Sequence, residues 1–366
     1  MSTESRAERL AALVSEARLE ALVVGDLVRP GDSGADAMAN VRWLTGFAGT
    51  SGLAIVGSER REFLTDFRYT ERAASEVGSE FDRVTLEGKL LAELAKRLEG
   101  RVGYDEDATS VSSLRKLTEA IPEGAELVPA NGLVERVRRI KDAGEIEAVA
   151  EASRLADDVF EWLAERGVAG RTERDVAQAA EGRMRDLGAE PSFPAIVGSG
   201  PNGALPHSEP GEREIGPAEL VVVDMGARVD GYCSDGTRTW ATGEVSEEAR
   251  EVYELVLRAQ EASLDAIRAG VTGVEADRVS RDPIDSAGRG ELYGHGLGHG
   301  VGLEVHEAPR LGKTSDDVLA EGDVVTVEPG VYVPGRFGVR IEDLVVVEAD
   351  GHRNLSSTSK ELRVVG

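Results

Sequence analysis

Two pairs of acidic residues lie in extended segments that the sequence predicts to fold into hairpins. In the first pair, Asp224 and Asp235 flank Asp230-Gly231, a two-residue turn signal between extended stretches. If these two residues form the turn, Asp224 faces Thr237 and lies diagonally from Asp235 on one face of the sheet. The two carboxylates then converge, whereas an arbitrary pair of aspartates more often caps a turn or is solvated.

The second pair, Glu328 and Glu342, flanks a turn rich in proline and glycine and centred on Gly335. In this register Glu328 lies directly opposite Glu342, and Arg340 falls on the same face. Like charges in opposite positions are destabilising unless a cation lies between them. Taken alone, this hairpin would be interpreted as a partly solvated acidic edge that Arg340 balances.

The histidines of this chain lie in unusual surroundings. A glycine at every even position from 294 to 302 argues strongly against a helix around His299. In an extended backbone, His295 and His299 share one face, which distinguishes this segment from the helical HExxH zinc motif. The other face is bare glycine, which backbone or a ligand can approach closely. Two further histidines, His207 and His306, also lie in glycine- or proline-rich segments, although a lone histidine is usually a satisfied core or surface residue.

At this point the sequence resembles a known family. Five residues match, in order and approximate spacing, the metal ligands of the pita-bread (M24) metallopeptidases, which include methionine aminopeptidases, aminopeptidase P and prolidase: Asp224, Asp235, His299, Glu328 and Glu342. Four carboxylates and one imidazole make an oxygen-rich site, which suits Mn²⁺ or Co²⁺, with Zn²⁺ as an alternative. The resemblance implies two such ions, which activate a shared water as the nucleophile.

The resemblance also implies a role for each residue of the site. Asp235 and Glu342 would bridge the two ions, Asp224 would complete one of them, and His299 with Glu328 would complete the other. Glu328 would also carry the proton from the water to the leaving nitrogen. Residues 193–207 and 305–307 resemble the segments that deliver the two active-site histidines of the family. His207 and His306 would therefore bind the scissile carbonyl and the proline side, while Arg340 and His295 would orient the ligands.

The first third of the chain alternates short apolar runs with helical stretches, which is an α/β pattern. We expect a helix over residues 90–98 and strands over residues 21–24, 53–56, 63–65 and 102–104. Residues 40–47 and 63–69 resemble the N-terminal domain of prolidases, aminopeptidases P and creatinases. Residues 28–39, rich in glycine and aspartate, are expected to form a loop longer than usual. We place the domain boundary near Leu133, giving a creatinase/prolidase-like domain over residues 1–133 and a catalytic domain over residues 134–366.

The second domain is expected to be an α+β pita-bread domain, an antiparallel sheet covered by helices. A helical stripe of apolar residues runs through residues 143–166. A second helix follows Thr172, with Asp175 in the capping-box position, and a third follows Ser246 and ends at Gly270. Hairpins lie between and after these helices, so strands and helices segregate instead of alternating.

Composition limits the partners and the location. A net charge of -26 disfavours binding to nucleic acid and to anionic membranes. The lone cysteine, Cys233, excludes an internal disulfide, and we find neither an export signal nor an apolar run of about 20 residues, so we expect a cytoplasmic protein. Arginine far outnumbers lysine and acidic residues are abundant, which suggests a halophilic source, although an ordinary acidic protein is the alternative. We expect a homodimer.

The sequence thus predicts a metal-dependent hydrolase that cleaves bonds preceding proline in dipeptides or short peptides. A bond to proline is a tertiary amide without an N–H, so it requires a dedicated pocket. Three alternatives are a creatinase-like hydrolase of a non-peptide substrate, a methionine aminopeptidase and a metal-free binding protein. The first and third lack the complete ligand set, and the second usually lacks the first domain. The compact length favours a dipeptidase over an aminopeptidase.

Overall fold

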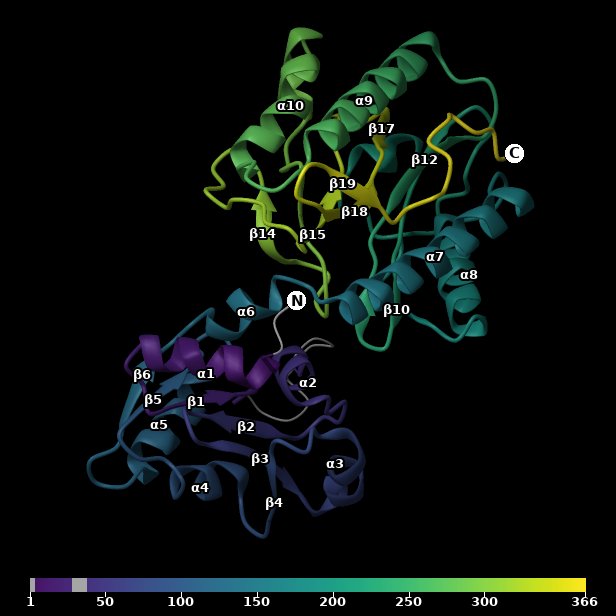
Figure 1. The fold of residues 1–366 in the computed structure, drawn as a ribbon. Coiled ribbons are helices and arrows are strands. Elements are labelled where there is room, and N and C mark those ends of the chain that lie inside the picture. The colour runs from purple at the N-terminus through teal and green to yellow at the C-terminus, as the bar shows by residue number, and fades with distance from the viewer. Residues whose placement is uncertain (1–3, 28–37) are drawn as a thin grey trace. The chain divides into compact units, whose positions relative to one another are not determined.

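The computed structural model describes residues 4–27 and 38–366 and divides into two compact units, Met1–Arg138 and Arg139–Gly366 (Figure 1). The division differs from the boundary expected near Leu133 by one short helix, α6 (Leu133–Arg138). This helix contacts α1 (Arg6–Glu16) and α2 (Ala39–Thr45) of the first unit and therefore belongs to it. Most of the long loop expected over residues 28–39 lies outside the described residues.

The first unit has a mixed six-stranded sheet in the order β4-β3-β2-β1-β5-β6. Strand β2 is antiparallel to β1 and β3, whereas β4, β5 and β6 each join a parallel neighbour. The strands are β1 (Ala21–Val24), β2 (Leu53–Val56), β3 (Arg61–Asp66), β4 (Asp82–Leu86), β5 (Arg101–Tyr104) and β6 (Glu126–Pro129). The remaining helices of this unit are α3 (Thr70–Glu76), α4 (Leu90–Ala95) and α5 (Val111–Ala120).

Alternation along the strands divides the apolar side chains of this sheet between two layers. Ala21 and Val23 of β1 and Leu53 and Ile55 of β2 pack with buried residues of α4 and α5, while α1 and α2 contact the same strands. The α/β prediction and its four strands are confirmed. The edge strands β4 and β6 were not predicted, because most of their residues are exposed or only half-buried and form no apolar run.

The second unit is built from antiparallel strand pairs covered by four helices. The helices are α7 (Ala143–Arg166), α8 (Glu173–Asp186), α9 (Glu247–Ala266) and α10 (Gly273–Ser286). The strands are β7 (Glu190–Pro191), β8 (Ile196–Ser199), β9 (Leu220–Asp224), β10 (Ala227–Val229), β11 (Tyr232–Cys233), β12 (Thr237–Ala241), β13 (Gly298–Gly300), β14 (Glu307–Leu311), β15 (Val324–Val327), β16 (Gly330–Val333), β17 (Phe337–Arg340), β18 (Asp343–Val347) and β19 (His352–Asn354). This is the predicted α+β domain.

The helices pack in two pairs, α7 with α8 and α9 with α10 (Figure 1). Apolar residues of α7 and α8 share a core with β8 and β9, and those of α9 and α10 share a core with β15 and β18. The predicted start of α8 is confirmed, because Thr172 and Asp175 form a reciprocal capping box. Among the helices of the described residues, none is both long and apolar enough to cross a membrane.

Helix α10 was not predicted, although Thr272 and Glu275 form the same type of capping box at its start. Its interior contains Pro283, which lacks the N–H that an internal helical turn needs. The low helix propensity of proline therefore argued against a helix in this segment. Helix α9 begins after Ser246 as predicted but ends at Ala266, before the glycine expected to stop it. Helix α4 likewise ends before the expected residue, Leu98.

Candidate metal centre and active-site cavity

The first hairpin has the predicted register. Asp224 at the end of β9 lies opposite Thr237 at the start of β12. The turn between β10 and β11 is made by Asp230 and Gly231, whose φ angles of 47° and 81° are both positive, as the two-residue hairpin turn requires. Asp235 lies in the short segment between β11 and β12, and Asp224 and Asp235 are both buried residues.

The second hairpin keeps one register through two separate ladders. β15 pairs with β18, and β16 pairs with β17, so Glu328 and Glu342 occupy opposite positions at the break between the ladders. At this break the backbone N–H of Glu342 donates to the carbonyl oxygen of Thr237 at 3.1 Å. This hydrogen bond joins the two hairpins, and it brings the four carboxylates to one place.

His299 lies on β13, between two glycines that are required by close backbone contacts. A Cβ atom on Gly298 or Gly300 would lie 2.1 Å from the carbonyl oxygen of Thr326 or Ala308, respectively. The Nδ1 atom of His299 lies 3.1 Å from the carbonyl oxygen of Gly300. Because a carbonyl only accepts, Nδ1 carries a hydrogen, and Nε2 is the ring nitrogen that faces the carboxylates.

Three of the predicted ligands form a tight cluster. Ligand atoms of Asp235, His299 and Glu342 all lie within 4.8 Å of one another. The Nε2 atom of His299 is 3.6 Å from Asp235 Oδ2 and 3.3 Å from Glu328 Oε1. Four residues from separate segments of the chain can therefore direct oxygen and nitrogen donor atoms toward one cation.

Arg340 is the buried cation of this cluster. It donates to Asp224 Oδ2 at 2.5 Å, to Thr237 Oγ1 at 3.0 Å and to the Tyr332 hydroxyl at 2.8 Å. Within residues 4–27 and 38–366, the buried atoms Asp224 Oδ1 and Glu342 Oε1 have no hydrogen-bond partner. A buried carboxylate oxygen is costly to leave unpaired, so the donor set fits divalent cations that prefer oxygen with some nitrogen.

The carboxylates repel one another in the metal-free protein. Burial and the charge of Glu342 raise the pKa of Asp235 well above its ordinary value, and burial and the charge of Glu328 do the same for Glu342. Burial also raises the pKa of Asp224, against the opposing charge of Arg340. Burial acts on Glu328 in the same direction, but the hydrogen bond from His299, together with the charges of His299, His295 and Arg340, outweighs it and lowers the pKa of Glu328 to about 2. Glu328 is therefore the carboxylate that ionises most readily.

His295 does not reach the carboxylates directly. Its Nδ1 faces the carbonyl oxygen of Gly296 at 2.8 Å, and its Nε2 accepts from the Tyr332 hydroxyl at 2.8 Å. Because Tyr332 in turn accepts from Arg340, a chain of hydrogen bonds runs from His295 to Asp224. Tyr332 was missed in the sequence, although its period-two spacing from Glu328 places it on the same face of the hairpin.

His306 lies against the proposed ligand His299, with 4.3 Å between the ring centroids. Burial and the nearby charges of His299 and Arg310 lower the pKa of His306 to about 4, so its ring is neutral at neutral pH. His207 also lines the cavity, and it follows Pro206, whose carbonyl oxygen accepts from Arg340 at 3.4 Å.

A cavity of about 630 Å³ contains all nine predicted site residues in its lining. This volume is in the range of small-molecule sites. Its other walls include an apolar group: Phe193, Pro194, Ile196, Val305 and Leu311. All of these except Leu311 lie in the two segments that resemble the family's active-site segments. Two charged residues of the lining, Glu209 and Arg310, were missed by the sequence reasoning. Both charged residues are exposed at the surface, which gives no sequence signal that separates them from ordinary surface charges.

Fold and site together define a two-domain chain, in which an α/β domain precedes a pita-bread domain with a carboxylate-rich candidate metal centre. Residues 147–349 match the description "Metallopeptidase family M24", and residues 6–140 match the description "Creatinase/Prolidase N-terminal domain". The chain belongs to metallopeptidase family M24. The predicted family and fold are thereby confirmed.

Similar proteins support the same family assignment over nearly the whole chain. The "uncharacterized peptidase YqhT" of Bacillus subtilis is 40% identical over 331 residues, which cover 89% of this chain and 93% of that protein. The solved Xaa-Pro dipeptidase from Bacillus anthracis has a TM-score of 0.92 at 40% identity, covering 98% of this chain and 99% of that one. The X-Pro aminopeptidase from Thermotoga maritima has a TM-score of 0.89 at 34% identity, covering 99% and 100%.

Proposed function

We propose that this protein hydrolyses peptide bonds that precede proline and that it uses two divalent cations, Mn²⁺ or Co²⁺ with Zn²⁺ as an alternative. The observation that carries the proposal is the convergence of four carboxylates and one imidazole, two of whose buried oxygens accept no hydrogen bond within the described residues. The names of the similar dipeptidase and aminopeptidase support the substrate class. The match to a creatinase/prolidase N-terminal domain counts against a methionine aminopeptidase.

The proposed cation-binding residues are the five predicted ligands: Asp224, Asp235, His299, Glu328 and Glu342. In this proposal Asp235 and Glu342 would hold both ions, and each of the other three residues would hold one. Two divalent cations bound there would supply an acidified water and stabilise the negative charge that develops on the scissile carbonyl oxygen. Arg340, held by Tyr332 and His295, fixes Asp224 Oδ2 and so leaves Oδ1 for a cation.

The remaining steps are assigned to side chains of the cavity. Glu328, which is ionised, takes the proton from the attacking water and delivers it to the proline nitrogen as the C–N bond breaks. His306, which is neutral, donates a hydrogen bond to the substrate carbonyl. His207, which also lines the cavity, contacts the proline side. The apolar lining, with Phe193 and Leu311 among its members, offers a surface for the proline ring.

Arg310 bears on the length of the substrate. It is an exposed arginine in the cavity lining, and its charge acts on His306. A guanidinium in this position can pair with the free carboxylate of a dipeptide. We therefore propose that dipeptides are preferred over longer peptides with proline in second position.

The test compares Ala-Pro, Ala-Pro-Ala and Ala-Ala as substrates of protein stripped of metal and then supplied with Mn²⁺, Co²⁺ or Zn²⁺. The proposal expects no hydrolysis without metal, recovery with Mn²⁺ or Co²⁺, and a higher kcat/KM for Ala-Pro than for the other two peptides. Full activity in the presence of a strong chelator would remove the metals from the reaction. Equal rates on Ala-Ala would remove the proline specificity, and faster cleavage of Ala-Pro-Ala would indicate an aminopeptidase.

Three further features remain proposals of ours. The single buried cysteine and the absence of a spanning helix among the described residues are compatible with a cytoplasmic protein. A net charge of -26 supports adaptation to high salt and disfavours nucleic acid as a partner. We propose a homodimer, which light scattering of the purified chain tests directly.

A further inference from the structure

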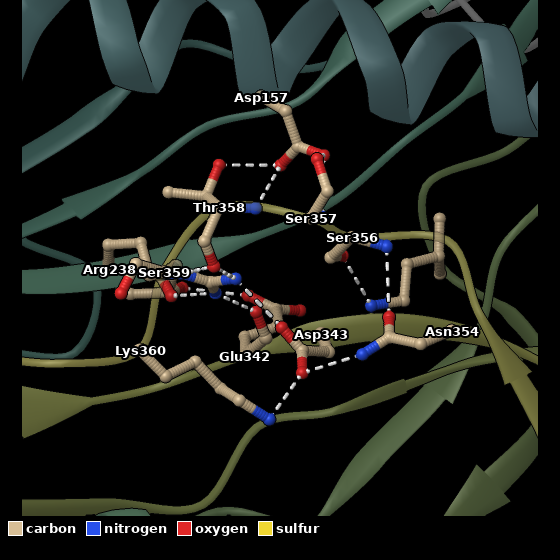
Figure 2. Close-up of polar contacts among 12 residues, drawn as sticks. Asp157, Arg238, Glu342, Asp343, Asn354, Ser356, Ser357, Thr358, Ser359 and Lys360 are labelled. Carbon is tan, nitrogen blue, oxygen red and sulfur yellow. Dashed lines mark hydrogen bonds and ion pairs between the residues drawn. The ribbon is translucent and has the colours of Figure 1, made fainter.

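A second polar cluster lies beside the proposed ligand Glu342 (Figure 2). It is built around Asp343, which follows Glu342 in the chain and is the first residue of β18. Because successive residues of a strand point to opposite faces, Asp343 faces away from the cavity that Glu342 lines. The side chain of Asp343 is buried, with 1% of its surface exposed. The residues around Asp343 therefore support Glu342 from the face opposite the cavity and do not line the cavity.

Arg238 connects this cluster to the backbone of Glu342. Its Nη2 donates to Asp343 Oδ1 at 2.8 Å, and its Nη1 donates to the carbonyl oxygen of Glu342. The preceding residue, Thr237, donates from its hydroxyl to Glu342 Oε2 at 2.7 Å. Two consecutive residues of β12 thus hold the ligand at both ends, Thr237 at the carboxylate and Arg238 at the main chain.

The carboxyl-terminal segment, residues 354–360, locks Arg238 and Asp343 in place. The carbonyl oxygen of Thr358 accepts from Arg238 Nη2 at 2.7 Å and from Nε at 3.2 Å. Asp343 Oδ2 accepts from Asn354 Nδ2 at 3.0 Å and from Lys360 Nζ at 2.9 Å. Figure 2 shows the segment passing between this cluster and α7, with Thr358 directed toward Asp157.

Asp157 on α7 holds the segment from the other side. Its Oδ2 accepts from the backbone N–H and the hydroxyl of Ser357, both at 2.7 Å, and its Oδ1 accepts from the Thr358 hydroxyl at 2.6 Å. The segment is therefore tied by two buried carboxylates that lie far apart in the sequence. Neither carboxylate lines the cavity.

We propose that Arg238, held by Asp343 and by Thr358 of the carboxyl-terminal segment, is a positioning residue for Glu342, so that residues 354–360 set the affinity of the metal centre. The inference rests on the proposed role of Glu342 as a metal ligand. A bridging carboxylate must be held closely in place, and only a guanidinium has a planar fork of donors that reaches three acceptors at once. A lysine at position 238 keeps the charge beside Asp343 but cannot reproduce that fork.

The experiment measures binding of Mn²⁺ alone to metal-stripped protein, by calorimetry and by the electron paramagnetic resonance signal of unbound Mn²⁺. Arg238→Lys is expected to bind at least one Mn²⁺ about 10- to 100-fold more weakly than the natural chain, the usual effect of losing a partner that orients a ligand. Lys360→Met removes a half-buried cation from Asp343 and is expected to weaken binding in the same direction by a smaller factor. Circular dichroism confirms that each variant is folded before the titration.

The chain offers a matched control in a second buried arginine–aspartate pair. Asp323 is fully buried and accepts from Arg139 Nε at 2.7 Å and from Nη2 at 2.6 Å. It precedes β15, at the opposite end of that strand from Glu328. Asp323→Asn therefore disturbs a comparable ion pair in the same sheet without touching a proposed ligand, and its Mn²⁺ affinity should equal that of the natural chain.

Each outcome decides the proposal. Weaker Mn²⁺ binding in Arg238→Lys and Lys360→Met, with Asp323→Asn unchanged, supports it. Unchanged binding in the first two variants, or an equal loss in Asp323→Asn, overturns it. If Arg238→Lys does not fold, the Lys360→Met titration alone decides, because that side chain lies at the edge of the cluster. If the natural chain binds no Mn²⁺, Co²⁺ or Zn²⁺, the metal-dependent function fails together with this inference, whereas normal binding with unaffected variants overturns only the inference.

Discussion

Replacing Asp235 by asparagine should stabilise the metal-free protein at neutral pH, although it removes a proposed metal ligand. Asp235 and Glu342 are both buried, and their ligand atoms lie within 4.8 Å of each other. When both carboxylates are ionised, two charges at that separation repel by about 3 kcal/mol at an effective dielectric constant of about 20. Asparagine has nearly the same shape and no charge. At a pH where both carboxylates of the natural chain are ionised, the catalytic domain of the metal-free variant should therefore unfold about 6 to 12 °C higher than that of the natural chain.

The sign of the pH dependence follows from the raised pKa of Asp235. Between the ordinary pKa of an aspartate and the raised one, the folded protein keeps a proton that the unfolded chain has lost. Stability therefore falls as the pH rises through this window. Above the raised pKa the loss of stability is constant, and it equals the free-energy cost of burying the charge. The same reasoning holds for Glu342, whose pKa is also raised. The advantage of Asp235→Asn should be small in weak acid and largest at about pH 8, where the natural chain is most fully ionised.

The assay is thermal unfolding of chelator-treated protein, followed by circular dichroism at several pH values and constant high salt. Asp282→Asn is the control, because Asp282 is a largely exposed aspartate on α10 whose replacement changes the net charge equally. That variant should gain nothing. Added Mn²⁺ should reverse the order, because the natural chain then binds its cations more tightly and is stabilised by them. A metal-free Asp235→Asn protein no more stable than the natural chain at pH 8 would refute the reasoning.

Three other predictions concern catalysis and salt. Glu328→Gln should keep the fold and lose turnover, because an amide cannot carry the proton, and a normal rate in a steady-state assay would exclude Glu328 from that role. His207→Ala and His306→Ala should each lower the rate by about 100-fold and still purify with two ions. His299→Ala should instead lose at least one ion, as measured by elemental analysis. Loss of metal from His207→Ala or His306→Ala would mean that a ligand is misassigned. Lowering the salt from ~1 M to ~0.1 M, where the screening length grows from ~3 Å to ~10 Å, should lower the unfolding temperature, and an unchanged value would argue against adaptation to high salt.

The hairpins show how much of the site the sequence could predict. A two-residue turn at Asp230-Gly231 determines the pairing of every residue on either side of it, so the partner of Asp224 followed from local chemistry alone. The register around Gly335 was equally predictable, and it extends through both ladders. The start of α8, where Thr172 and Asp175 form a capping box, was predictable for the same local reason.

Contacts between distant segments were beyond this reasoning. No pattern in the sequence indicates that the backbone of Glu342 bonds to Thr237, or that Tyr332 lies between His295 and Arg340. The resemblance to a family assigned Arg340 and His295 to the site, but only the packed structure shows by which hydrogen bonds each one acts. Two arginines illustrate why sequence reasoning missed such residues. Arg310 resembles an ordinary surface charge, and Arg238 lies in a strand whose pattern indicates a buried core.

The lone thiol of the chain offers a way to observe the interior of the catalytic domain. Cys233 on β11 is fully buried; its N–H donates to the carbonyl oxygen of Gly302 at 2.7 Å, and its Sγ lies 3.8 Å from that of Leu303. A reagent can reach this sulfur only when β11 separates from the segment that leads to His306. The rate of labelling under native conditions therefore reports the free energy of that local opening. Because the chain has no second cysteine, the signal arises from one place without any engineered probe.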